Sequence, residues 1–137
     1  MTIRKTEFLN VDLVLRHAGG LRKLLRALRS GTVVLHAEEK FAIVQSKEHP
    51  KTIEAAIAGL LEPIDALTKA ARAIWDGCGV RQFDIGIQAG EKPNSTEFKV
   101  SCESIERIRS VGGEVVITIY GSGLPEVAAQ SPRRVIR

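Results

Sequence analysis

The segment from Arg81 to Gly90 constrains the fold more than any other part of this 137-residue chain. Its apolar side chains alternate strictly with polar residues or glycine, and this period of two is typical of a β-strand with one buried face. The longest helical pattern in the sequence precedes it, and a turn-rich segment follows it. The rest of the chain must therefore cover one side of this strand. That apolar side consists of Phe83, Ile85, Ile87 and Ala89, and the opposite side of Gln82, Asp84, Gly86 and Gln88.

Length and composition predict one soluble domain with a buried core. Hydrophobic residues make up 44% of the chain and charged residues 26%, as is usual for globular proteins. The first residues show no signal-peptide pattern. The longest apolar run, residues 55–61, is far shorter than the roughly 20 residues needed to span a bilayer. We therefore expect a cytoplasmic protein without membrane contact, with a single domain over residues 1–121 and a loosely held basic tail over 122–137.

Several elements are predicted before residue 50. Residues 6–16 alternate as a strand, and residues 21–29 place leucines at helical spacing with basic residues between them. Residues 32–37 and 40–46 are rich in apolar and β-branched side chains and are joined by a short acidic turn. This pattern predicts a β-hairpin.

A long helix is predicted from Thr52 to Ile74. Its apolar residues recur at every third or fourth position, which places them along one side of a helix. Because proline lacks an amide hydrogen, we expect a kink or a break at Pro63, with both halves still packing on the same surface. The apolar stripe consists of Ile53, Ile57, Leu60, Ile64, Leu67, Ala71 and Ile74.

Three more elements are predicted after Gly90. Residues 96–101 alternate as the second strand of a hairpin with residues 81–90. Ser101 is a candidate N-cap of a short helix, and residues 114–120 have high β propensity. We expect the helix to bury Ile105, Ile108 and Val111.

The predicted fold class is α+β. The order β-α-β-β-α-β is that of a ferredoxin-like antiparallel sheet with helices on one face, extended by a C-terminal β-α-β unit. In that arrangement the first strand is central and pairs with the strand at residues 81–90. This pairing would bring Asp12 and Asp84 onto the same uncovered face, without fixing how close they are. The last three elements are expected to widen the sheet or to cover part of that face.

The C-terminal half resembles small bacterial proteins classed only as domains of unknown function. The residues that carry the resemblance are Ala73–Asp76, Phe83–Gly86, the helix around Ile105–Gly112 and the closing Ile117–Gly121. Some of those families look like interaction or immunity modules. The resemblance implies a fold of this class and assigns no catalytic residue.

The predicted open face of the sheet carries the first candidate site. Two neighbouring carboxylates can share a proton, bind a cation or contact a partner, and the alternative is that they are ordinary solvated residues. A glycine in this face marks either a bulge or a flat place where a partner strand or the C-terminal segment lies. The partner-binding candidates are Asp12, Asp84, Gly86 and Gln88.

The first helix and the chain ends carry the excess of positive charge in a protein of net charge +4. Such a basic surface is either simply solvated or binds an acidic protein or the phosphates of nucleic acid. Aromatic residues are only 4% of the chain, which leaves few stacking platforms for bases. The basic candidates are Arg16, Arg22, Lys23, Arg26, Arg29, Arg133 and Arg134.

No residue pattern typical of catalysis is present in the sequence. Cys78 and Cys102 lack metal-ligand spacing and are expected to be reduced thiols, and neither a phosphate-binding loop nor a nucleophile elbow occurs. We therefore expect a non-enzymatic, immunity-like or adaptor-like module that needs no cofactor or metal. Its expected partner is another protein, and a homodimer through a sheet edge is a further expectation. The alternative is nucleic-acid binding through the basic helix and tail.

Overall fold

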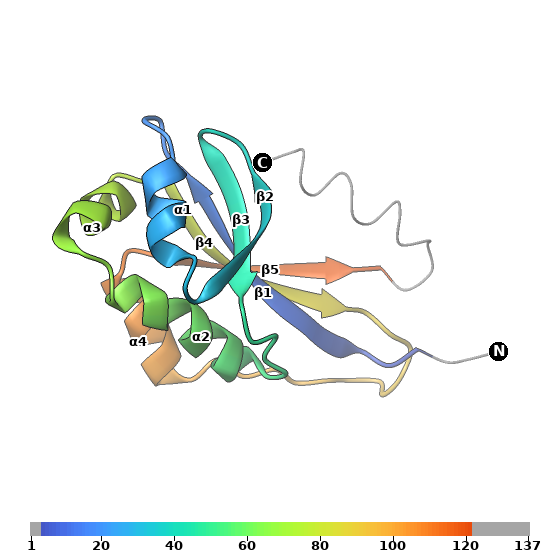
Figure 1. The fold of residues 1–137 in the computed structure, drawn as a ribbon. Helices are drawn as coiled ribbons and strands as arrows, with labels where there is room; N and C mark the ends of the chain where they lie inside the picture. The colour runs from blue at the N-terminus through green and yellow to red at the C-terminus, as the bar shows by residue number, and fades with distance from the viewer. Residues whose placement is uncertain (1–3, 122–137) are drawn as a thin grey trace.

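The computed structural model describes residues 4–121. It shows an α+β fold in which helices cover one face of a five-stranded mixed sheet (Figure 1), so the predicted class is confirmed. The strands lie in the order β2-β3-β1-β4-β5. The predicted tail, with Arg133 and Arg134, lies outside the described residues. The elements are β1 (Glu7–Arg16), α1 (Arg22–Leu28), β2 (Thr32–Ala37), β3 (Phe41–Ser46), α2 (Ile53–Asp65), α3 (Lys69–Asp76), β4 (Val80–Gln88), α4 (Cys102–Ser110) and β5 (Glu114–Tyr120).

The centre of the sheet is the antiparallel pair of β1 and β4. Their register runs from Glu7 opposite Gln88 to Arg16 opposite Val80, with a bulge in β1 at Leu9. The other side of β1 pairs with β3, which forms the predicted hairpin with β2. The central place of the first strand and its pairing with the segment at residues 81–90 are thus confirmed.

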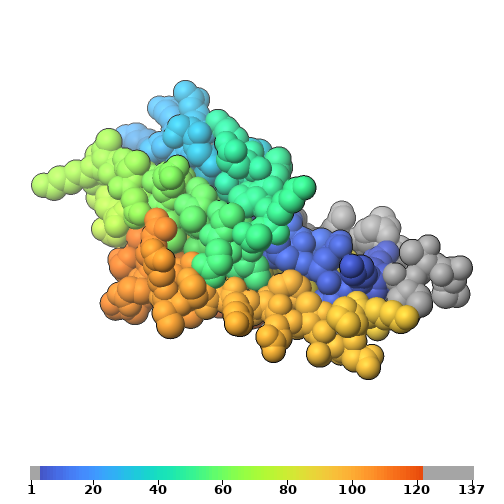
Figure 2. Space-filling view, turned by 90° about the horizontal axis from the view of Figure 1, so that it is seen from below, coloured from blue at the N-terminus to red at the C-terminus, as the bar shows by residue number. Residues whose placement is uncertain are grey.

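The edge next to β4 is formed by β5, which runs parallel to β4. The predicted strand at residues 96–101 is wrong, because this segment is extended without belonging to the sheet. It has to carry the chain from the end of β4 back to α4, since a parallel strand needs a crossover connection. Figure 2 shows the connection (gold) running beside the start of β1 (blue) toward α4 (orange). A ferredoxin-like order is therefore not confirmed, because the strand order of this mixed sheet differs from the predicted one.

The predicted long helix is two helices, α2 and α3, joined by residues 66–68. Pro63 lies inside the last turn of α2, so the break falls just after the proline. Thr68 begins α3 by accepting a backbone hydrogen bond of 3.2 Å. Both helices contribute to the same core, for example through Ile64 and Trp75, which confirms their common packing surface.

The core lies between the helices and one face of β1, β3 and β4. Every second residue of β1 and β4 points into it, as the alternation predicts. Trp75 is completely buried, and its indole nitrogen donates a hydrogen bond of 2.9 Å to the carbonyl of Val111. The largest fully buried side chains of this core include Trp75, Phe83, Leu13, Leu15, Leu21, Leu24, Leu28, Ile57, Leu60, Leu61 and Ile64.

Candidate functional site

Asp12 and Asp84 lie directly opposite each other on neighbouring strands, which confirms that they share one face of the sheet and shows in addition that they are neighbours. They are only 1% and 2% exposed, and the interpretation as solvated surface residues is therefore wrong. Asp12 accepts a hydrogen bond from the amide of Gln45, and Asp84 accepts one from the hydroxyl of Thr118, both at 2.7 Å. Each carboxylate takes part in at least one further interaction. Because buried charges need such partners, the pair is part of how this face of the sheet is held together.

The other two partner-binding candidates contact the neighbouring strand β5. A Cβ atom added to Gly86 would lie 3.3 Å from the side chain of Asn10 and 3.7 Å from the ring of Tyr120. The close approach that a strand glycine permits is therefore made within the sheet itself. Gln88 donates hydrogen bonds to the carbonyls of Tyr120 and Gly121, at 3.4 and 3.1 Å. Both residues thus help to fix the end of β5.

The basic surface of the first helix is exposed, as predicted. Two adjoining hollows of about 500 and 260 Å³ lie between α1 and α3, and both are lined by Lys23 and Ile74. Arg16 does not belong to this surface, because its guanidinium lies 4.7 Å above the ring of Phe41, on the sheet face away from the helices. We define the α1 basic surface by the exposed side chains Arg22, Lys23, Arg26 and Arg29.

The most exposed apolar side chains lie at the β5 edge of the sheet, where no candidate residue was predicted from the sequence. Val115, Ile117 and Ile119 are 42%, 59% and 65% exposed. Their register with β4 places them on the face that the helices cover elsewhere. Ile105 on α4 is 50% exposed, so its predicted burial is wrong. We define Val115, Ile117 and Ile119 as the β5 apolar surface.

The two edges of the sheet differ in how they are protected. The edge strand β2 also exposes apolar residues, including Val34, but a bulge at Leu35 interrupts its register. The edge strand β5 pairs with β4 over its whole length without a bulge, and it contains no proline or lysine and only one charge, at Glu114. Bulges, prolines and charges are the usual means of preventing strand addition. Because β2 also contains no proline or lysine, the bulge is what distinguishes the two edges, and among residues 4–121 the regular edge of β5 is the better template for another strand.

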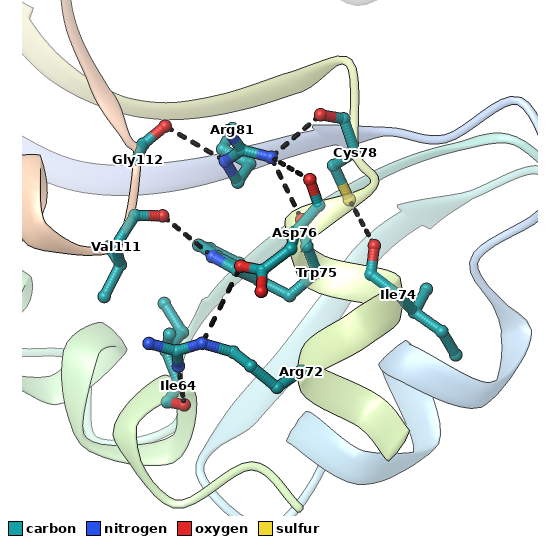
Figure 3. A network of polar contacts seen from close by, with 9 residues as sticks. All are labelled: Ile64, Arg72, Ile74, Trp75, Asp76, Cys78, Arg81, Val111 and Gly112. Atoms are coloured by element: carbon teal, nitrogen blue, oxygen red, sulfur yellow. Dashed lines mark hydrogen bonds and ion pairs between the residues drawn. The ribbon is translucent and has the colours of Figure 1, made fainter. Parts of the chain in front are cut away.

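The start of β5 is fixed by Arg81, the second residue of β4 (Figure 3). Its guanidinium donates to the carbonyl of Gly112 at 3.0 Å and to the carbonyls of Trp75 and Cys78 at 3.0 and 2.8 Å. The latter two carbonyls lie at the C-terminal end of α3, where a helix favours positive charge. Arg81 thus joins the end of α3 to the turn between α4 and β5.

The start of α4 is fixed by Glu54 on α2. Its carboxylate accepts hydrogen bonds from the amide and hydroxyl of Ser101, at 2.6 and 2.9 Å, and from the hydroxyl of Ser104. The hydrogen bond from Ser104 is the main cause that lowers the pKa of Glu54, followed by that from the Ser101 amide. A carboxylate at a helix N-terminus also interacts favourably with the helix dipole. This contact holds α4 against α2 and beside β5.

Few of the described side chains have the environment of a reactive group. Cys78 and Cys102 are both free, and burial raises the pKa of the Cys78 thiol to about 11, so that this thiol stays protonated at neutral pH. Among residues 4–121, no group of three His, Cys, Asp or Glu side chains could hold a metal ion. In the same range, no helix is long and apolar enough to cross a membrane.

Comparisons with protein-family models, with curated proteins and with solved structures find no match to this chain. The resemblance to bacterial domains of unknown function therefore stays a prediction. The surfaces described above are the basis on which a function can be proposed.

The contact between Glu54 and α4 predicts a pH-dependent contribution to stability. Because the pKa of Glu54 is lowered in the folded protein, the carboxylate stabilises the fold above its unfolded-state pKa, and this contribution is lost as the pH falls through the folded-state pKa. Glu54→Gln should thus lower the free energy of unfolding at pH 7 by about 1 kcal/mol or less, since the carboxylate is partly exposed. Urea unfolding at pH 7 and at an acidic pH below the unfolded-state pKa measures the difference, which should be smaller at the lower pH.

The matched control is Glu62→Gln, an exposed position on the same helix. This variant should have little effect at either pH. A loss for Glu54→Gln that is equal at both pH values would show that the charge of the carboxylate does not stabilise α4.

Proposed function

We propose that this protein is a non-enzymatic protein-binding module that adds a strand of its partner to the outer edge of β5. The main observation that supports this proposal is a regular edge strand with three apolar side chains that are 42–65% exposed. Within residues 4–121, no strand pairs with this edge. An added strand would satisfy the outward backbone N–H and C=O groups and bury the β5 apolar surface.

The energy of such binding would come from apolar burial and backbone hydrogen bonds. Removing apolar surface from water contributes roughly 25 cal/mol per Å². Residues 102–120, which include α4 and β5, carry three acidic and two basic side chains, or a net charge of −1. Long-range attraction is therefore weak at this edge, and the surface favours an extended apolar segment over a highly charged one.

A charge placed on the β5 apolar surface should abolish partner binding. Ile117→Lys puts an ammonium group on the apolar face, beside the side chains of the added strand, whereas it remains solvated in the free protein. In pull-downs from a nuclease-treated native lysate, wild-type protein should retain a stoichiometric partner, which includes any untagged copy of this chain. Ile117→Lys should weaken retention at least about tenfold, equivalent to 1.4 kcal/mol.

The control is Val34→Lys on the other edge strand, where the wild-type side chain is 42% exposed. It adds the same charge to a similarly exposed apolar position and should leave retention unchanged. Circular dichroism confirms that both variants are folded. Retention of the same proteins at the same levels by Ile117→Lys would refute the proposed function.

Nucleic-acid binding is the second candidate function, and the exposed α1 basic surface favours it. Its side chains lie beside the two hollows between α1 and α3, where phosphates could approach. If the surface binds nucleic acid, the triple variant Arg22→Glu, Arg26→Glu, Arg29→Glu should bind duplex fragments far more weakly. It should also reduce the slope of log affinity against log salt, by about 0.9 for each lost phosphate contact. Fluorescence anisotropy over a salt series measures both effects.

A scattered variant with the same change in net charge tests whether the position of the charges matters. Lys47, Lys51 and Lys99 are exposed outside α1, and their replacement by Glu should have a smaller effect. Equal affinities for wild-type protein and the α1 variant would eliminate this second function.

A further inference from the structure

We infer that the strand added to β5 is β5 of a second copy of this chain, in an antiparallel pair about a twofold axis through Ile117. The inference rests on the proposed function, because it names the occupant of the same edge. This β5–β5 pair would join two five-stranded sheets into one continuous sheet. The interface would be isologous, which means that both copies contribute the same surface.

The helix-facing side of β5 is complementary to itself in this register. With Ile117 opposite its own copy, Val115 lies opposite Ile119 of the second copy, and the reverse pair forms by symmetry. All three exposed side chains of the strand therefore meet apolar side chains. Cross-strand pairs of β-branched residues are among the favourable contacts of antiparallel sheets.

The other side of β5 is also compatible with self-pairing. Glu114, the only charged residue of the strand, lies opposite Tyr120 of the second copy, and Val116 lies opposite Thr118. The two glutamates are therefore at opposite ends of the interface. No like charges meet across the strands, an arrangement that would be destabilising in a sheet.

Neighbouring registers are less favourable. An axis through Val116 would place Ile119 opposite Gly113 of the second copy, and an axis through Thr118 would place Val115 opposite Gly121. Each shift replaces an apolar cross-strand contact by a contact with glycine outside the strand. Under a twofold axis, residues of the same face must lie opposite each other, so the pairing register can change only in steps of two residues. Moving the axis by one residue, to Val116 or Thr118, makes such a step, and these are therefore the nearest alternatives.

The surface around β5 suits a second copy better than the α1 basic surface does in a chain with net charge +4. The twofold axis is perpendicular to the sheet, so the helices of both copies lie on the same face and the two α4 helices flank the junction. The exposed charges of α4 are largely compensated within the helix, as in the 2.6 Å ion pair of Glu106 and Arg109. Two α1 basic surfaces would instead repel each other.

Complementary charges at the symmetry axis test the occupant directly. Wild-type protein should elute with a light-scattering mass of twice the chain mass of 14.9 kDa. Ile117→Lys and Ile117→Glu each place two like charges opposite each other, and each should raise the dimer Kd by at least about a hundredfold. An equimolar mixture of the two variants should restore a dimer, because Lys then faces Glu. The same two substitutions at Val34 should leave the wild-type dimer intact.

The outcomes separate the inference from the proposed function. Wild-type protein that stays monomeric at high micromolar concentration, while Ile117→Lys still loses a captured partner, overturns the second copy but leaves strand addition at β5 intact. A dimer that survives Ile117→Lys, together with unaltered partner capture, overturns both. A mixture of the Lys and Glu variants that stays monomeric overturns the symmetric pairing.

Cysteine cross-linking tests the register in a Cys102→Ser background, which removes the exposed native thiol. Ile117→Cys should form an intermolecular disulfide, because directly opposite Cβ atoms, about 4.5–5.5 Å apart, need to approach by only about 1 Å to reach the separation in a disulfide. Val115→Cys should cross-link slowly with itself and at least about tenfold faster with Ile119→Cys, since only the mixed pair is directly opposite. Faster self-cross-linking of Val115→Cys than of Ile117→Cys would overturn this register.

Discussion

The hydrogen bonds of Arg81 join parts of the structure that come from very different places in the chain. The residue begins one of the two central strands, while its guanidinium binds carbonyls at the end of α3 and in the turn before β5. Arginine suits this role because its planar group donates several hydrogen bonds in fixed directions and always keeps its charge. The turn it binds depends on glycine, since Gly112 has a φ of +75° and a Cβ on Gly113 would lie 2.7 Å from the ring of Phe83. The position of β5 follows from these contacts.

Contacts within the fold fix the position of β5, but they do not bury its apolar side chains. Glu54 holds α4 against α2, and the helix layer covers the apolar face of β1, β3 and β4. At β5 the same face stays largely exposed. Among residues 4–121, folding therefore leaves the outer edge of a regular strand without a paired strand and its apolar side largely exposed. In the proposed function, association is the step that buries them. The bulge in β2 shows that the other edge of the sheet has a feature that opposes such association.

Alternation and the pairing of the first strand with residues 81–90 could be predicted from the sequence, but the register of that pairing could not. The period of two in residues 81–90 gives the correct inward and outward sides of β4 and places Asp12 and Asp84 on the same face, whereas their direct opposition is known only from the structure. The same period in residues 96–101 has another cause, because Phe98 and Val100 pack on the core while the backbone belongs to no strand. In this segment the local pattern shows which side chains pack on the core but not which backbone groups are paired.

The helix α4 shows a second limit of prediction from sequence, which concerns contacts between residues that are far apart in the chain. The spacing of Ile105 and Ile108 fits one apolar face, yet Ser104 takes the buried position because it hydrogen-bonds to Glu54 on another helix. This contact joins residues 50 positions apart and leaves no local pattern in the sequence. The exposure of the β5 apolar surface could not be predicted for the same reason, since it depends on where the helix layer ends.

Amide hydrogen exchange of β5, resolved by residue with NMR in dilute and in concentrated solution, tests the central claim most directly. The amides of β5 that face β4 are paired in the monomer, whereas those that face outward are paired only when a second strand is added. The account predicts that the outward set gains protection with concentration in wild-type protein and does not in Ile117→Lys. Equal exchange of the outward amides at both concentrations in wild-type protein would contradict strand addition by a second copy.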